Sequence, residues 1–233
     1  MPHVSVDAAD KSGNFQAYVA TPANLPAPAI VVIQEIFGVN EDMRKKCDAF
    51  AEAGYIAVCP DLFWRQEPDV DLTDQSKAEW DKALELLNGF NIDKGVDDLQ
   101  STLTLTRRIE GCNGRVGCVG YCLGGKLAYL MAARTDVDVS VGYYGIELDK
   151  YLNEASGIKN PLMLHIAELD KFSSDEKRKK ILDHLENFPS VSAHVYPGVD
   201  HAFARTAGDH YDAAAATLAN TRTDAFFAQH LKG

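Results

Sequence analysis

The sequence predicts an α/β fold in which a mostly parallel central sheet has helices on both faces. Seven short apolar runs rich in Val, Ile and Tyr alternate with longer stretches of helical spacing, and this alternation is typical of layered α/β proteins. The chain has 233 residues, 46% of them hydrophobic, which is enough for a substantial core. We therefore expect one domain that spans residues 1–233.

The expected strands are short, apolar and bounded by turn residues. They cover residues 15–20, 29–34, 55–60, 115–121, 139–144, 161–167 and 191–197. The expected helices lie between them and place apolar residues three or four positions apart, as Met43, Cys47 and Phe50 illustrate. They cover residues 40–54, 77–90, 95–111, 126–134, 173–188 and 209–232.

One long polar connection, residues 61–76, interrupts this alternation. It fits a surface excursion over the carboxyl edge of the sheet, where such folds bind ligands, and it equally fits a solvated loop without a role. The basic run at residues 177–180 is interpreted as an exposed helix face.

Charge and composition exclude several classes of protein. A formal net charge of −11 argues against a nucleic-acid partner, and no apolar run approaches the roughly 18 residues of a membrane span. The first residues contain no apolar segment of a signal peptide, so we expect a cytoplasmic protein. Its five cysteines include no CxxC pair, which disfavours disulfides and a zinc site.

A cysteine lies between glycines where an apolar strand is followed by a helix. Gly120-Tyr121-Cys122-Leu123-Gly124 resembles the nucleophile elbow of α/β-hydrolases, with cysteine in place of the usual serine. The amino end of the following helix favours a thiolate, and the Leu123 N–H would point toward a developing oxyanion. The alternative is a small buried cysteine in a glycine turn.

An acid and a histidine follow this cysteine in the chain order that an α/β-hydrolase requires. Asp170 comes just after the expected strand 161–167, and His201 follows strand 191–197 and a Pro-Gly turn. In this interpretation Asp170 holds the imidazole and His201 exchanges a proton with the sulfur and the leaving group. Alternatively Asp170 caps the next helix and His201 is a surface loop residue. His165, inside an apolar run, is expected to be a core histidine.

Six stretches together resemble the dienelactone hydrolase family of α/β-hydrolases. They are QEIFGVN (34–40), YIAVCPDLFWRQ (55–66), GVDDL (95–99), GYCLGGKLAYL (120–130), VGYYG (141–145) and HAFARTAG (201–208). The resemblance implies a single α/β-hydrolase domain that cleaves lactone or ester bonds. It implies Cys122 as nucleophile, Asp170 as acid and His201 as base.

The same resemblance assigns roles to residues 35 and 36. Glu35 would contact the cysteine in the resting enzyme and help to generate the thiolate when substrate arrives, and the Ile36 N–H would be the second oxyanion donor. A carboxylate at the end of a buried strand is unusual without a partner. The alternative for Glu35 is an exposed loop acid.

The substrate-binding residues depart from the family pattern. Arg205 matches a family arginine that binds the substrate carboxylate, and Phe37 is placed with it in the substrate site. Trp80 stands where a second arginine is expected, Leu84 where an aromatic hydroxyl is expected, and Ala202 where a serine is expected. We therefore expect a substrate that is broader or less anionic than dienelactone. Trp80 and Leu84 could also be plain helix core, because they share one helical face.

The sequence thus predicts a hydrolase that acts on a small ester or lactone through an acyl-cysteine. It implies no metal or organic cofactor, no nucleic-acid or membrane partner, and a monomer or homodimer. One alternative is a thiol redox protein, which needs a resolving cysteine near Cys122, with Cys118 as the nearest in sequence. The other is a non-catalytic binding module on a hydrolase scaffold.

Overall fold

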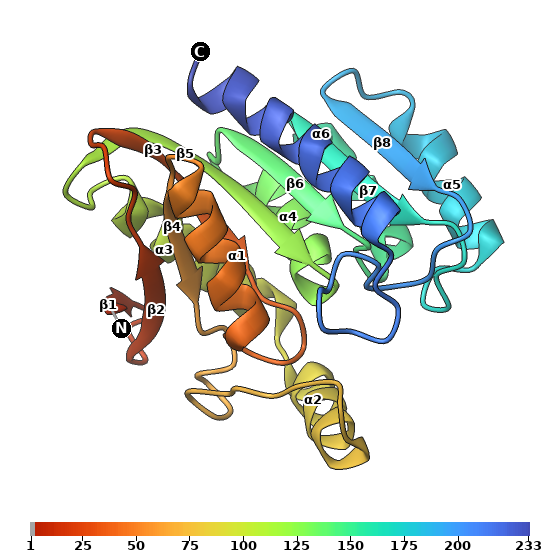
Figure 1. The fold of residues 1–233 in the computed structure, drawn as a ribbon, viewed down its shortest axis with the longest axis horizontal. Helices are drawn as coiled ribbons and strands as arrows, with labels where there is room; N and C mark the ends of the chain where they lie inside the picture. Colours follow the sequence, from red (N-terminus) through yellow and green to blue (C-terminus); the bar gives the residue numbers. More distant parts are fainter. Residues whose placement is uncertain (1–2) are drawn as a thin grey trace. The chain divides into compact units, whose positions relative to one another are not determined.

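The computed structural model describes residues 3–233, and the chain divides into two compact units at residue 117. Across the described residues eight strands form a mostly parallel sheet in the order β1-β2-β4-β3-β5-β6-β7-β8 (Figure 1). The division falls inside β5 (Cys112–Tyr121). The sheet and its helices confirm the predicted α/β class.

The first unit contains the antiparallel edge of the sheet. β1 (His3–Asp7) pairs with β2 (Asn14–Ala20), and β2 pairs with β4 (Ile56–Pro60), both antiparallel, whereas β3 (Ala27–Ile33) runs parallel to β4. Every residue of β3 is buried, as expected for a strand that is covered on both faces. β1 was not predicted from the sequence. Val6 is the one fully buried residue of this strand, and an edge strand of this kind gives little apolar signal.

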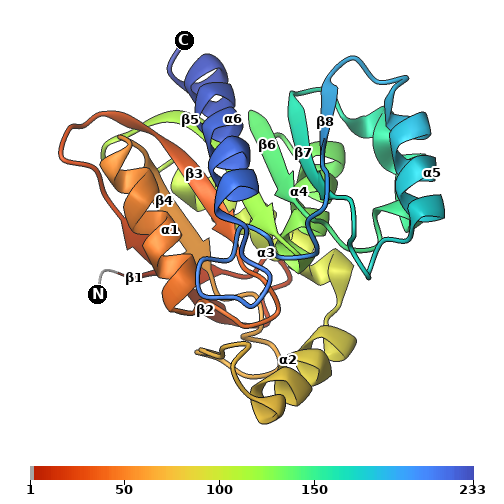
Figure 2. The ribbon, with the colours of Figure 1, turned by 45° about the vertical axis from the view of Figure 1, so that its right-hand side comes forward.

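Two helices of this unit cover its strands. α1 (Glu41–Glu52) packs against β2, β3 and β4, and α3 (Ile92–Thr106) packs against β1, β3 and β4 on the other face (Figures 1 and 2). The predicted face of α1, Met43, Cys47 and Phe50, is the buried one. α2 (Lys77–Gly89) lies away from the strands in both views.

The polar connection of residues 61–76 is anchored within the first unit and is not a freely solvated loop. Asp71 forms a β-bridge with Gly38, and the Leu72 amide donates to the Phe37 carbonyl over 3.0 Å. Arg65 forms an ion pair with the buried Asp98 at 2.7 Å. The connection is therefore held against residues 37 and 38, next to Glu35 and Ile36.

The second unit holds parallel strands between two layers of helix. β6 (Val139–Tyr143), β7 (Leu162–Ala167) and β8 (Val191–Tyr196) pair in parallel. α4 (Leu123–Arg134) packs on one face of β6 and α6 (Ala213–Leu231) on the other, while α5 (Asp175–Leu185) lies beside β8 (Figures 1 and 2). Two short 3₁₀ helices, η1 (Leu148–Lys150) and η2 (Leu152–Gly157), were not expected from the sequence.

A buried polar network ties α6 to the strands of this unit. His165 on β7 is fully buried and contacts the Tyr196 hydroxyl through Nδ1 (2.7 Å) and the Thr223 hydroxyl through Nε2 (2.9 Å). Thr223 also contacts the Tyr143 hydroxyl at 2.6 Å. Burial lowers the pKa of His165 to about 3, with smaller effects of His194 and Arg222, so the ring is neutral. His165 is therefore a core histidine, as predicted.

Candidate active site

Cys122 has a strained backbone at the junction of β5 and α4. Its φ of 56° and ψ of −113° lie outside the regions that side chains prefer, and such conformations cost about 1–3 kcal/mol. Its amide donates to the Tyr143 carbonyl over 3.1 Å, and its own carbonyl accepts from the Lys126 amide, the first helical bond of α4. The side chain is therefore carried on a sharp turn at the amino end of a helix.

Two glycines make this turn possible. A Cβ at Gly120 would lie 1.9 Å from the Gly124 carbonyl oxygen, so any side chain there would collide with the start of α4. A Cβ at Gly125 would lie 2.4 Å from the Tyr143 carbonyl oxygen. Gly120 belongs to the motif that the sequence shows. The need for a glycine at residue 125 was not predicted, because that constraint comes from β6 and not from the turn itself.

The side chains of Asp170 and His201 are hydrogen-bonded to each other, although the two residues lie 31 positions apart in the sequence. The His201 Nδ1 lies 2.8 Å from Asp170 Oδ2, and both residues are buried. The other carboxylate oxygen, Oδ1, accepts from the Phe172 amide over 2.9 Å, which fixes the orientation of the carboxylate. Ser174, not Asp170, accepts the capping bond at the start of α5. His201 is 4% exposed, so it is not a surface loop residue.

The electrostatic surroundings of His201 favour its charged form. Burial by itself lowers the pKa of His201, but electrostatic interaction with Cys122 and the hydrogen bond with Asp170 outweigh it and raise the pKa to about 10. Cys122 is 5% exposed and lies in the same unit as both partners. The acid and the histidine predicted from the sequence are thus hydrogen-bonded to each other, and Cys122 lies in the same unit.

Two aromatic side chains that sequence reasoning missed hold the His201 ring. Tyr144 contacts it edge-on with the ring centroids 5.0 Å apart, and Phe172 does so at 4.8 Å. Tyr144 has a positive φ of 36°, and its amide donates to the His165 carbonyl at 2.7 Å. Tyr144 directly follows a strand, and Phe172 lies two residues after Asp170, which are the only signals that the sequence offers.

Three predicted site residues lie on the turn after β3, in the first unit. Glu35 is 2% exposed, so the alternative of an exposed loop acid is wrong. Ile36 and Phe37 are buried beside it. The neighbouring Gln34 accepts from the Leu62 amide at 3.0 Å, which links this turn to the 61–76 connection.

The remaining predicted residues belong to α2 and to the segment after His201. Trp80 is half-buried, contacts Phe37 edge-on at 5.1 Å and donates from Nε1 to the Asp74 carbonyl at 3.0 Å. Leu84 is 39% exposed, so it is not helix core; Ala83 and Leu86 form the buried face of α2. Arg205 is buried in the second unit.

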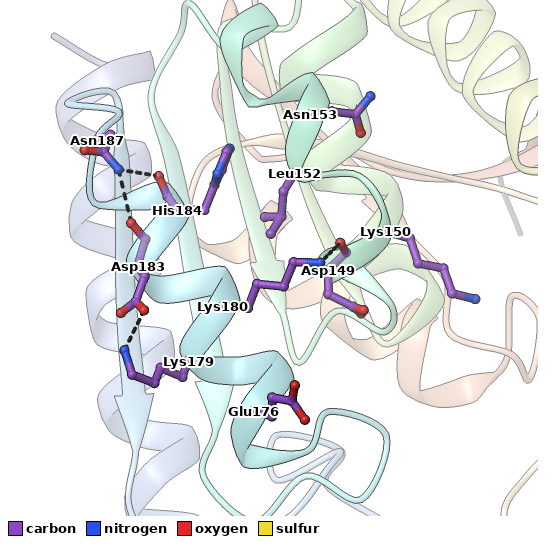
Figure 3. Close-up of a pocket in the computed structure, with 10 residues that line it drawn as sticks. All are labelled: Asp149, Lys150, Leu152, Asn153, Glu176, Lys179, Lys180, Asp183, His184 and Asn187. Atoms are coloured by element: carbon purple, nitrogen blue, oxygen red, sulfur yellow. Dashed lines mark hydrogen bonds and ion pairs between the residues drawn. The ribbon is translucent and has the colours of Figure 1, made fainter.

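A groove of about 790 Å³ lies elsewhere in the second unit, between the two 3₁₀ helices and α5 (Figure 3). Figure 3 shows Lys179 paired with Asp183, and Lys180 directed toward the Asp149 carbonyl. The lining includes none of the site residues predicted from the sequence. Its charges balance one another, and its lining contains no cysteine, serine or threonine, so we do not regard it as the active site.

A search of residues 3–233 finds no cluster of three or more His, Cys, Asp or Glu side chains that could hold a metal ion. Within the same residues, none of the helices combines the length and the apolar character needed to cross a membrane.

The fold and the elbow at Cys122 define the class of protein as an α/β-hydrolase. Solved structures of similar fold include a protein of Klebsiella pneumoniae provisionally named dienelactone hydrolase, with a TM-score of 0.83 at 24% identity and 98% of each chain covered. They also include dienelactone hydrolase from Anabaena variabilis, with a TM-score of 0.71 at 19% identity, covering 99% of this chain and 97% of the other. At such identities these structures establish the fold alone.

The family is established by sequence. The model of the dienelactone hydrolase family matches residues 15–231. The chain is 52% identical over 233 residues to an Azospirillum brasilense protein provisionally named carboxymethylenebutenolidase, covering 99% of this chain and all of that one. It is 42% identical over 214 residues to carboxymethylenebutenolidase of Pseudomonas putida, covering 92% and 91%. The chain therefore belongs to the dienelactone hydrolase family and is a hydrolase.

Proposed function

We propose that the protein hydrolyses small lactones or carboxylic esters through an acyl group carried on Cys122. The surroundings of His201 support this most strongly. Its Nδ1 is hydrogen-bonded to Asp170, and Cys122 contributes to raising the pKa of the ring. A histidine between a carboxylate and a cysteine is suited to move a proton between sulfur and a leaving group.

In the proposed acylation, the Cys122 sulfur, whose proton has passed to His201, attacks the substrate carbonyl carbon. A C–S bond forms, and the carbonyl electron pair moves to oxygen to give a tetrahedral oxyanion. The oxyanion then collapses, the bond to the leaving oxygen breaks, and this oxygen takes the proton from His201 Nε2. Asp170 stays ionised and holds the ring through Nδ1.

In the proposed deacylation, a water molecule gives a proton to the neutral His201 as its oxygen attacks the acyl carbon. The C–S bond breaks, the acid leaves, and the sulfur takes a proton back from His201, which restores the resting thiol. We propose the Leu123 and Ile36 amides as donors to both oxyanions. Leu123 is the first residue of α4, where amide hydrogens have no acceptor inside the helix, which supports its part.

We propose further that Glu35 restrains the resting thiol. Its burial at 2% exposure supports a specific partner, because a carboxylate is rarely buried without one. We expect Glu35→Ala to change the pH profile of Cys122 alkylation by iodoacetamide. Glu52→Ala, which removes an exposed acid of α1, is the control. Superimposable profiles for wild type and Glu35→Ala, with unchanged ester kinetics, would remove Glu35 from the mechanism.

The substrate that we propose is neutral and less polar than dienelactone. The Trp80 N–H is engaged by the Asp74 carbonyl, so this residue offers an apolar ring where the family pattern expects a second arginine. Leu84 adds exposed apolar surface on the same helix. Apolar contact contributes about 25 cal/mol per Å² buried, and a net charge of −11 repels anions at long range.

The test compares kcat/KM for dienelactone and for a neutral aryl ester of similar size, at fixed salt. We expect wild type to prefer the neutral ester. Trp80→Arg should gain about 10- to 100-fold on dienelactone, because a charge-assisted hydrogen bond contributes roughly 1.5–3 kcal/mol. Ala78→Arg adds the same charge at an exposed position of α2 and should gain far less. A wild-type preference for dienelactone, or equal gains in the two variants, would contradict the proposal.

The surroundings of Cys118 argue against a thiol redox function. Cys118 is fully buried, its sulfur donates to the Ser140 hydroxyl at 3.3 Å, and burial raises its pKa to about 12. A resolving cysteine needs an accessible thiolate. The cytoplasmic location and the monomeric or homodimeric state remain predictions.

A further inference from the structure

We propose that Asp200 is a positioning residue, which holds the backbones on either side of the Asp170–His201 bond so that His201 meets Cys122 in a productive orientation. This inference rests on the proposed function. Asp200 contacts backbone amides of both loops and no reacting atom, so it acts through the residues that it holds.

A series of hydrogen bonds joins the loop after β7 to the loop after β8. The Glu168 amide donates to the Tyr196 carbonyl at 3.1 Å, and the Leu169 amide donates to the Val199 carbonyl at 2.9 Å. The Glu168 side chain crosses in the other direction and accepts from the Gly198 amide at 2.8 Å. These bonds hold the two loops together as far as the residue before Asp170.

Asp200 adds a further link between the two loops, next to Asp170 and His201. Its Oδ1 accepts from the amide of His201 itself at 2.6 Å and lies 3.4 Å from the amide of Lys171, the residue after Asp170. One carboxylate oxygen therefore binds the backbone of both halves of the acid–base pair. Hydrogen bonds to an ionised acceptor are stronger than neutral ones, which suits a loop that must keep one geometry.

The chain after His201 needs such a restraint. Ala202 has a φ of 64°, a left-handed conformation that an alanine adopts at a cost. A relaxation there would rotate the backbone of His201 and carry its ring away from Asp170 and Cys122. Misplacement of a catalytic group by about 1 Å can reduce the rate roughly 100-fold.

The contact with His210 does not replace these bonds. The His210 Nδ1 lies 3.6 Å from Asp200 Oδ2, beyond hydrogen-bonding distance, and His210 is largely exposed, so solvent screens the pair. Asp200 is itself 27% exposed. We therefore expect the acceptor oxygen of Asp200 to matter more than its negative charge. Replacement by asparagine tests this, because asparagine keeps an acceptor oxygen and carries no charge.

The experiment compares Asp200→Ala, Asp200→Asn and Asp209→Asn. We expect Asp200→Ala to lower kcat for a neutral aryl ester by about 10- to 100-fold with little change in KM, because the acceptor is lost. Asp200→Asn keeps an acceptor oxygen and should stay within about threefold of wild type. Asp209→Asn removes the same charge from an exposed residue of the same segment and should match wild type. Rates are divided by the fraction of folded protein, measured by circular dichroism.

A second measurement needs no substrate. The low-field NMR signal of the proton between His201 Nδ1 and Asp170 should persist in wild type and Asp200→Asn and should weaken or shift in Asp200→Ala. Should Asp200→Ala fail to fold, Asp200→Ser takes its place, because its oxygen is one bond closer to the backbone and cannot span both amides. Equal kcat and an unchanged signal in the alanine or serine variant would overturn the inference, as would equal losses in Asp200→Ala and Asp200→Asn.

Cys122→Ala in the same assay separates the two proposals. If it hydrolyses the ester as fast as wild type, the proposed function fails, and the NMR signal still decides the role of Asp200. If it is inactive while Asp200→Ala matches wild type in kcat and signal, the Asp200 inference alone fails.

Discussion

The surroundings of His165 and of His201 give the same residue type opposite protonation states. Both histidines are buried in the second unit, one in the middle of β7 and the other after the end of β8. His165 contacts two neutral hydroxyl groups, and burial lowers its pKa to about 3. His201 is hydrogen-bonded to the Asp170 carboxylate, and interactions with Cys122 and Asp170 raise its pKa to about 10 despite the burial.

This difference shows that burial alone does not decide the chemistry of a histidine. Desolvation penalises the charged ring at both sites, so the sign of the shift depends on whether anionic groups lie within reach. The neutral network around His165 holds α6 against the strands. The surroundings of His201 favour a charged ring, which suits the proton transfer that we propose. The partners of a buried histidine thus distinguish the structural His165 from the proposed catalytic His201.

Removal of Cys122 should produce the largest effect. We expect Cys122→Ala to lower ester turnover by about 10⁴-fold or more while the chain stays folded, because loss of a nucleophile removes the reaction route. Since Cys122 contributes to the raised pKa of His201, that pKa should fall in the variant. Activity assays and NMR titration of His201 measure the two effects.

Cys118→Ala is the matched control for this prediction, because Cys118 is a buried cysteine on β5, the strand that leads to Cys122. It should keep its turnover. Cys122→Ser should also be poor, because a hydroxyl is much harder to ionise than a thiol. Near-wild-type turnover in a folded Cys122→Ala protein would exclude the nucleophile assignment.

A change at His165 should affect stability and leave the chemistry of folded molecules intact. His165→Leu removes the hydrogen bonds of His165 to the Tyr196 and Thr223 hydroxyls, and each such bond contributes about 0.5–1.5 kcal/mol. We therefore expect the free energy of unfolding to fall by roughly 1–3 kcal/mol, measured with urea. His194→Leu, at a half-exposed histidine stacked on His165, should cost less. A large loss of kcat per folded molecule would show that the two histidines are not separate in function.

The pH dependence of stability should have opposite signs for the two histidines. The raised pKa of His201 stabilises the fold fully below its ordinary value near 6.5, and this contribution is lost as the pH rises through about 10. The lowered pKa of His165 stabilises the fold above 6.5, and this contribution is lost as the pH falls toward about 3. Urea unfolding between pH 5 and 10 should show that His201→Gln mainly changes the alkaline limb and His165→Leu the acid limb. Identical changes in both limbs would contradict the comparison.

Local patterns predicted the elements and the positions of the chemical groups. The apolar spacing in α1 identified its buried face, and turn residues after β7 and β8 placed Asp170 and His201 at strand ends. Because parallel strands end at one edge of a sheet, their order along the chain was enough to expect an acid beside a histidine. The bond between them is present at 2.8 Å.

The missed features depend on contacts between distant segments. Asp200 accepts a hydrogen bond from the Lys171 amide, 29 residues away, and Gly125 is constrained by the carbonyl of Tyr143. Neither contact leaves a periodic or local signal in the sequence. The 3₁₀ helix η1 begins after Glu147, whose left-handed backbone is held by ion pairs with Lys126 and Lys150 and could not be read from composition.

Capture of the acyl-enzyme tests the central claim most directly. Wild-type protein turning over an excess of an activated aryl ester is quenched with acid and digested, and the acyl group is located by peptide mass spectrometry. We expect an acyl group on Cys122 and on none of the other four cysteines. An acyl group on another residue during turnover, with Cys122 unmodified, would contradict it.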